Sequence, residues 1–214
     1  MKAKKTLALI LCVVLVMAMS TAGTLAYFTS QDEAINTFSV GSVEIDLTES
    51  KVDEDGKVIV GAEPVRANSY HLLPGQTYDK DPTVTVLAPS SECYVRMMVT
   101  VELNNELDDD ALALALDDIF TGYDKDKWPR ENKTVAADKK SISYEYRYFK
   151  TVNAEAGDEE LPPLFAGFTV PGEWNNEELA RLQGMKINVE AHAIQAIGFD
   201  DADAAWIAFG QQHP

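Results

Sequence analysis

The sequence predicts an all-β fold in which one-sided strands pack as an antiparallel β-sandwich with short helical insertions. Three segments, residues 93–103, 142–148 and 185–193, alternate apolar and polar side chains with a period of two. This alternation is typical of strands that bury one face and expose the other to water. Two antiparallel sheets packed face to face bury every such apolar face, so a sandwich is the fold class that satisfies all three segments.

Shorter strands are expected before the longest one. Residues 43–48 alternate in the same way, and Asp53–Gly56 is typical of a turn that leads into a strand at Val58–Val60. Pro74 and Gly75 predict another turn, which is followed by a strand at Thr83–Val86.

Residues 104–141 interrupt this rhythm and predict an insertion made of a helix and a loop. An alanine-rich and leucine-rich stretch favours a helix that begins near Asp108 or Asp109, with the acidic cluster at its positive end. The polar stretch Asp124–Lys140 is expected to be a long loop. Two further short helices are expected at residues 175–182 and 201–209.

The amino terminus has the features of a secretory signal peptide over residues 1–26. Three lysines precede an apolar run of 13 residues, Leu7–Met19, and small or polar residues follow it. Thr24 at −3 and Ala26 at −1 suit a signal peptidase, so Tyr27 would be the first mature residue. An uncleaved membrane anchor is the alternative, because Tyr27 and Phe28 extend the apolar character toward a spanning length. After cleavage the chain would contact no membrane.

The mature chain is strongly acidic. Removal of residues 1–26 takes away three lysines and no acidic residue, which leaves 188 residues with 15 basic and 35 acidic side chains and a formal charge of −20. Such a charge argues against nucleic acid and anionic lipid surfaces as partners, because both would repel it. The length suits one β-sandwich domain over residues 42–214, preceded by an extended N-terminal segment at 27–41.

The sequence offers little catalytic chemistry. It contains no glycine-rich phosphate loop, no nucleophile elbow and no zinc-binding helix motif. His71, His192 and His213 are scattered, so a satisfied or solvent-facing histidine is the better interpretation of each, and Cys93 is expected to be an inert buried thiol. We therefore expect no catalytic residue, no cofactor and no metal.

Four acidic clusters are the remaining candidate ligands, and calcium is the ion they would suit. Turn formation, helix capping and solubility explain them without a metal. The clusters are Asp53–Asp55, Asp108–Asp110, Asp124 with Asp126, and Asp200 and Asp201 with Asp203. The tyrosines at 144, 146 and 148 form either part of the sandwich core, which we favour, or a strip that faces carbohydrate.

Several stretches resemble the TasA/camelysin family of exported proteins, which carry a signal peptide processed by a SipW-type peptidase. The match touches both ends of the chain, and residues 104–141 are the least matched. The stretches that carry it are Gly23–Thr29, Asn36–Gly41, Val43–Glu49, Leu73–Gln76, Lys80–Val84, Tyr94–Arg96, Pro163–Phe165, Ile187–Ala196 and Asp203–Trp206. The resemblance implies a jelly-roll β-sandwich in the extracellular matrix of a bacterial biofilm, and a subunit that forms fibres with copies of itself.

The resemblance also implies that the new N-terminal segment donates a strand to a neighbouring subunit. Its apolar residues, which would fill pockets there, are Tyr27, Phe28, Ile35, Phe38 and Val40. Physical principles alone leave two alternatives open, because the segment can also fold back on its own subunit or stay unpaired. We expect a secreted, non-enzymatic matrix or cell-surface protein, either a fibre-forming subunit or an accessory of fibre assembly that assembles by strand donation. The alternatives are a camelysin-like metal-dependent endopeptidase, for which zinc-ligand spacing is absent, and a monomeric surface module that binds a glycan or a protein.

The signal peptide generates the first prediction. Replacing Ala26 with arginine should block processing, because the −1 pocket of a signal peptidase accepts only small side chains. Amino-terminal sequencing of the secreted protein should find Tyr27 first in the wild type and no mature product in the variant. Normal processing of Ala26→Arg, or a mature terminus well inside the domain, would contradict the assignment.

Overall fold

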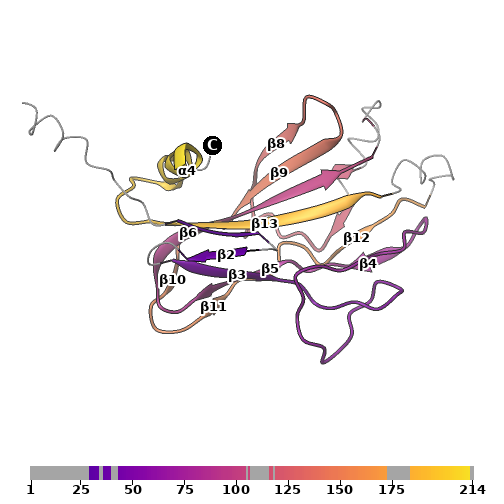
Figure 1. Ribbon diagram of the computed structural model, residues 1–214, viewed down its shortest axis with the longest axis horizontal. Coiled ribbons are helices and arrows are strands. Elements are labelled where there is room, and N and C mark those ends of the chain that lie inside the picture. The colour runs from indigo at the N-terminus through magenta and orange to yellow at the C-terminus, as the bar shows by residue number, and fades with distance from the viewer. Residues whose placement is uncertain are drawn as a thin grey trace, which may run out of the picture.

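A computed structural model describes residues 29–33, 36–39, 43–104, 106, 116–117, 119–172 and 184–212, with only the backbone described at 29–33 and 36–39. The strands lie in two facing layers that enclose one apolar core (Figure 1). All pairings between named strands are antiparallel within this part of the chain. The antiparallel β-sandwich predicted from the alternating segments is therefore confirmed.

One layer is a seven-stranded sheet, and six of its strands follow one path from edge to edge. In spatial order these are β2 (Asn36–Ser39), β1 (Thr29–Glu33), β13 (Lys186–Gln195), β6 (Ser90–Glu102), β9 (Ser141–Arg147) and β8 (Arg130–Val135). The seventh strand, β10 (Val152–Ala154), pairs with the first residues of β6.

The facing layer consists of two three-stranded sheets. One has the order β11 (Glu159–Glu160), β5 (Thr83–Leu87), β3 (Glu44–Thr48), and the other has the order β4 (Thr77–Asp79), β12 (Gly167–Thr169), β7 (Phe120–Thr121). The sequence predicted β3 and β5. The short strands of this layer lack an alternating pattern long enough to be recognised, since several contain only two or three residues.

Strand β6 is the central element of the larger sheet. Its apolar positions from Cys93 to Val101 are each no more than 1% exposed, whereas the residues between them are half-buried. The strand pairs with β13 from Cys93 to Glu102 and with β9 from Arg96 to Glu102. The alternation read from the sequence therefore assigned the correct face of β6 to the interior.

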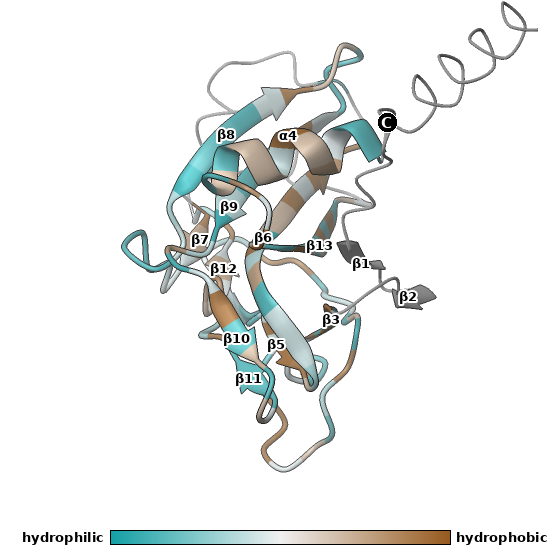
Figure 2. Cartoon of the chain, turned by 90° about the vertical axis from the view of Figure 1, so that its left-hand side faces the viewer, coloured by the Kyte–Doolittle hydropathy of each residue, from teal (hydrophilic) through white to brown (hydrophobic). Residues whose placement is uncertain are grey.

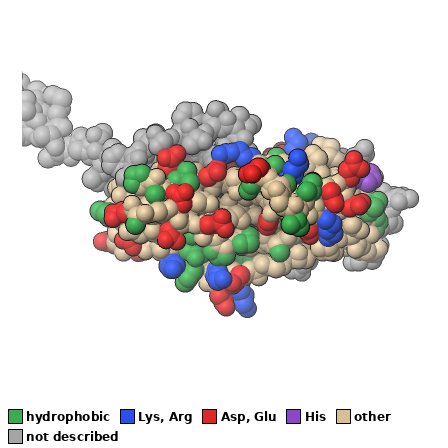
Figure 3. Space-filling view, turned by 90° about the horizontal axis from the view of Figure 1, so that it is seen from below, with side chains coloured by type: hydrophobic (Ala, Val, Ile, Leu, Met, Phe, Trp, Pro, Cys, Tyr) green, Lys and Arg blue, Asp and Glu red, His purple; other side chains and the backbone are tan. Residues whose placement is uncertain are grey.

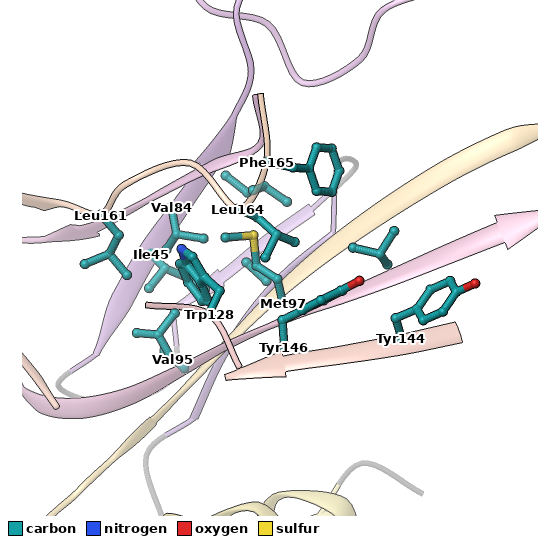
Figure 4. Packing of buried hydrophobic residues seen from close by; sticks show 14 of the residues in the cluster. Ile45, Val84, Val95, Met97, Trp128, Tyr144, Tyr146, Leu161, Leu164 and Phe165 are labelled. Carbon is teal, nitrogen blue, oxygen red and sulfur yellow. The ribbon is translucent and has the colours of Figure 1, made fainter. Parts of the chain in front are cut away.

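The core between the layers is rich in aromatic side chains (Figure 4). Trp128 is fully buried among aliphatic residues, and its indole Nε1 donates a hydrogen bond to the carbonyl of Pro162 at 3.0 Å. Tyr144 and Tyr146 project from β9 into the same core, so core packing, the favoured interpretation of these tyrosines, is confirmed. Burial of each such large side chain contributes roughly 1.5–3 kcal/mol.

The structure corrects the prediction that Asp124–Lys140 is a long loop. Residues 130–135 form β8, an edge strand that pairs with β9. Its side chains are mostly exposed, and Figure 2 shows much of the strand as hydrophilic. An edge strand of this kind lacks the alternating apolar pattern because neither of its faces is deeply buried, which explains why the sequence indicated a loop.

A second correction concerns Val58–Val60, which do not form a named strand. Only an isolated bridge joins Val58 to Val52, and Val60 is 94% exposed. β-branched residues favour strands where they can pack against a pleated surface, whereas these three side chains are 40% to 94% exposed.

One helix of the described residues is long, α4 (Ala202–Gln212), which confirms the helix expected at 201–209. The side chain of Asp201 accepts a hydrogen bond from the amide of Ala204 at 2.9 Å and so caps its first turn. Leu116 and Asp117 are helical, but the rest of the helix expected from Asp108 and the helix expected at 175–182 lie outside the described residues.

The register of β6 generates the second prediction. Val99→Asp would place an unpaired carboxylate in the core, which costs on the order of 3–5 kcal/mol and should prevent accumulation of folded protein. Thr100→Asp is the matched control on the opposite face, where the threonine hydroxyl meets Ser143 Oγ at 2.9 Å, and it should cost about 1 kcal/mol. The yield of folded protein compares the two variants, and urea unfolding measures the stability of Thr100→Asp; equal yields would contradict the register.

Candidate functional site

The N-terminal segment forms two strands on the edge of the larger sheet. Strand β1 pairs antiparallel with β13, from Thr29 opposite Ile194 to Asp32 opposite Ala191, and β2 pairs with β1. Of the five residues expected to fill pockets in a neighbour, Phe38 lies in β2, opposite Gln31. Tyr27, Phe28, Ile35 and Val40 lie outside the described residues, as do Thr24 and Ala26 of the expected cleavage site.

This placement corresponds to the folded-back arrangement that the sequence left open. The segment expected to be a single extended run contains two antiparallel strands. The backbone of β13 at residues 191–194 lies between β6 on one side and β1 on the other, and all four of these residues are at most 6% exposed. Without β1, the amide and carbonyl groups on one side of β13 would lose their partners, and an unpaired strand edge is a template for another chain.

Helix α4 covers the outer face of the same sheet near β13. Trp206 and Phe209 of the helix form a second small core with Ile194 and Ala205. The guanidinium carbon of Arg96 lies 4.4 Å from the ring centre of Trp206 and 4.9 Å from that of Phe209. The helix is thus held by apolar packing together with cation–π attraction to a partly buried arginine.

Arg96 also joins a polar network beneath the helix. Its Nε donates to His192 Nδ1 at 3.1 Å, and its terminal nitrogen lies 3.3 Å from a carboxylate oxygen of Glu145. Burial lowers the pKa of Arg96, and the charge of Glu145 opposes this effect. Arg147 pairs with the same Glu145 oxygen at 2.8 Å and also binds Asp203 of the helix. The network links β6, β9 and β13 to α4.

The network decides between the two environments expected for His192, because its Nδ1 accepts a hydrogen bond from Arg96 inside the protein. The sequence placed it on the polar face of its strand, where it was expected to be satisfied or solvent-facing. It is 6% exposed and its ring stacks on Phe209 with centroids 4.9 Å apart, because the helix covers this face. The spacing of Ala205, Trp206 and Phe209 on one side of the helix is the signal that could have indicated a covered face.

A cavity of about 290 Å³ lies where the insertion meets β9. Its walls are mainly aromatic, and Phe120 stacks on Phe165 with ring centroids 4.4 Å apart. The residues that line it are Asp117, Phe120, Tyr123, Arg130, Tyr146 and Phe165. Burial, opposed by the charge of Arg130, raises the pKa of Tyr146 to about 12, so this hydroxyl is neutral at physiological pH. The sequence does not indicate a site here, because the residues that line the cavity come from separate segments.

Asp117 organises the charges at this cavity. One of its oxygens accepts a hydrogen bond from the Tyr144 hydroxyl at 2.7 Å, and the other binds Lys133 Nζ at 2.7 Å. A terminal guanidinium nitrogen of Arg130 lies 4.0 Å from Asp117 Oδ1. Burial alone would raise the pKa of Asp117, but the hydrogen bonds from Lys133 and Tyr144, with the positive charges of Lys133 and Arg130, outweigh it and hold the pKa below its usual value.

A buried ion pair anchors the loops beside β3 and β4. Lys80 binds Glu49, and both side chains are less than 10% exposed. Asn68 Nδ2 donates to the other Glu49 oxygen at 3.0 Å, and Asp81 accepts from the amide and the hydroxyl of Ser50 at 2.7 and 2.6 Å. The buried charges are thus paired and hydrogen-bonded, which a stable buried pair requires. This arrangement gives a structural role to the segment that begins at Lys80.

The acidic clusters that the structure describes take part in local hydrogen bonding. Asp53 accepts from two amides of its own turn, Asp124 accepts from the amide of Asp126 at 3.0 Å, and Asp201 caps α4. The cluster at 108–110 lies outside the described residues. No three His, Cys, Asp or Glu side chains within the described ranges are grouped so that they could hold a metal ion.

The remaining candidate groups are Cys93 and the other histidines. Cys93 is fully buried, and burial raises the pKa of its thiol to about 12, so the expectation of a buried thiol is confirmed. His71 is exposed, and His213 lies outside the described residues.

Comparisons with protein-family models, with curated proteins and with solved structures found no match. Across the ranges that the structure describes, no helix is both long and apolar enough to span a membrane.

The Asp117 cluster generates the third prediction. Because the pKa of Asp117 is lowered in the folded state, its ionised form stabilises the fold above the ordinary aspartate pKa of about 4, and this contribution is lost as the pH falls through the lower folded pKa. Asp117→Asn should lower the free energy of unfolding by about 1–2 kcal/mol at pH 7. The difference from wild type in urea unfolding should shrink below about pH 4, and a difference independent of pH would contradict the assignment.

Proposed function

We propose that this chain is a secreted, non-enzymatic structural protein of a bacterial extracellular matrix or cell surface, and that it assembles into fibres with copies of itself. In this proposal a SipW-type peptidase cleaves the signal after Ala26. The new N-terminal segment is then exchanged between neighbouring subunits. The observation that carries the proposal is the position of β1, which begins at Thr29, three residues beyond the expected cleavage site, and lies on the edge of β13.

The β1–β13 contact is of a kind that two subunits can exchange. Its register is a ladder of backbone pairs, which an identical segment from another copy would reproduce without any change in sequence. Only residues 40–43 separate β2 from β3, and short hinge segments favour exchange of the element they join. The folded-back segment is then the form of an isolated subunit, and the donated segment is the form within a fibre.

The resemblance to the TasA/camelysin family supports the same function from the sequence side. The segments that carry it include Lys80–Val84 and Ile187–Ala196, which here contribute the buried ion pair and the strand that receives β1. The acidic charge of the mature chain fits an extracellular protein that must stay soluble until assembly. The proposal assigns no catalytic residue, cofactor or metal.

Strand exchange generates the fourth prediction. Purified mature protein should form long particles in negative-stain electron microscopy. Deletion of residues 27–39 should give a less stable domain that forms none, because the donated element is gone and the edge of β13 is left unpaired. Phe28→Asp combined with Ile35→Asp should also abolish fibres, because each change places a charge in an apolar pocket. The matched control is Phe149→Asp with Ile197→Asp, two exposed apolar positions outside the segment, which should assemble normally.

The same preparations separate the rival functions. Fibres of normal length from the deletion variant would rule out strand donation. Cleavage of casein that a chelator abolishes would favour the metal-dependent endopeptidase. A wild-type protein that stays monomeric and retains a component of cell-wall extracts would favour a surface binding module.

A further inference from the structure

The loop at residues 51–63 exposes a run of three β-branched side chains, and we refer to it as the apolar loop. Val58 and Ile59 are each 40% exposed, and Val60 is 94% exposed. The loop projects from the lower edge of the molecule in Figure 1, and the same edge is lowest in Figure 2. Single exposed apolar residues are ordinary on protein surfaces, but a contiguous exposed run indicates a contact with a partner.

The loop is held firmly in this conformation. Asp53 Oδ1 accepts hydrogen bonds from the amides of Asp55 at 3.0 Å and Lys57 at 2.9 Å. The amide of Val58 donates to Asp79 Oδ2 at 3.0 Å, and Gly56, at a φ of 71°, lies buried in contact distance of Tyr78. The apolar tip is therefore presented outward by a pre-organised frame, which reduces the entropy lost when it binds.

The charge around the tip indicates the partner's chemistry. Residues 51–63 contain four acidic and two basic side chains, and one of the basic ones, Lys57, is paired with Asp79 at 3.3 Å. Glu54, Asp55 and Glu63 are exposed. On the face drawn in Figure 3, acidic side chains are interspersed with apolar ones. A complementary partner surface would therefore be an apolar hollow with positive charge at its rim.

The cavity beside Asp117 has this chemistry. Phe120, Phe165 and Tyr146 provide aromatic walls, and Arg130 lines the same cavity with a 40% exposed side chain. The two positive charges of Lys133 and Arg130 exceed the single negative charge of Asp117, and both oxygens of Asp117 are already hydrogen-bonded. Its volume of about 290 Å³ is larger than the roughly 150 Å³ of an apolar cavity that binds a benzene-sized group. A branched aliphatic side chain would therefore fit it.

We infer that the apolar loop of one copy docks into this aromatic cavity of the next copy, with Val60 as the inserted side chain. The loop lies at the lower edge in Figures 1 and 2, whereas β8, which begins with Arg130, lies in the upper part of both views. A contact between two different surfaces is heterologous, and where its rotation does not close into a ring it extends into an open chain of subunits. The inference rests on the proposed function, and it adds a side-chain contact between subunits to the backbone contact made by β1.

Assembly of point variants generates the fifth prediction. Val60→Asp should raise the critical protein concentration for fibre formation about tenfold or more, because an apolar anchor in the cavity is replaced by a charge. Arg130→Gln should raise it about threefold to tenfold, since the rim loses its charge complement to the acidic loop. Ile207→Asp, at a 65% exposed position on α4, is the matched control and should leave the concentration unchanged. Equal behaviour of Val60→Asp and Ile207→Asp would overturn the inference.

A cross-linking experiment locates the contact directly. A diazirine-bearing aliphatic amino acid at position 60, in an equal mixture of isotopically light and heavy full-length mature protein, should give cross-links between copies to Phe120, Tyr146 or Phe165 by mass spectrometry. If fibres form but position 60 cross-links to other residues, or gives no cross-link, the docking inference is overturned and strand donation is left intact. Absence of fibres together with cross-links into the cavity would instead contradict the proposed function and support the docking contact.

Discussion

The antiparallel pairing of β6 with β13 on one side and β9 on the other is the interaction on which the rest of the structure depends. Because side chains alternate along β6, this pairing fixes two surfaces at once. One surface carries Val95, Met97 and Val99 into the sandwich, and the other carries Arg96 beneath α4. A shift of one residue in this register would exchange the two surfaces and disrupt both cores.

The same pairing determines where charged residues can be buried. Arg96 lies inside the molecule because Glu145 of β9 and His192 of β13 occupy neighbouring positions in the register and share its hydrogen bonds. Tyr144 of β9 donates a hydrogen bond from its hydroxyl to Asp117 of the insertion. Each buried charge is thus matched by a partner from another element, which keeps the cost of removing it from water low.

The edge of β13 connects the fold to the proposed function. β13 is buried on both faces near residues 191–194, between the sandwich core and α4, so its backbone must be paired on both sides. In the structure β1 of the same chain supplies this pairing, and in a fibre the equivalent strand of another chain would supply it. The apolar loop and the aromatic cavity lie elsewhere on the surface, and a contact between them would restrain the rotation of one subunit against the next.

The sequence by itself determined the fold class and the long strands, because a period of two in β3, β5, β6, β9 and β13 is a local property that depends on which face is buried. It also indicated α4 and the buried position of Cys93. It did not predict β8, because an edge strand with two exposed faces has no such pattern. Nor did it place His192, since only the packing of α4 decides that the polar face of β13 is covered there. The tertiary structure alone decided the cavity beside Asp117, because the residues that line it come from segments distant in the sequence. It also decided that Val60 is exposed, because the packing of distant segments determines which side chains are covered.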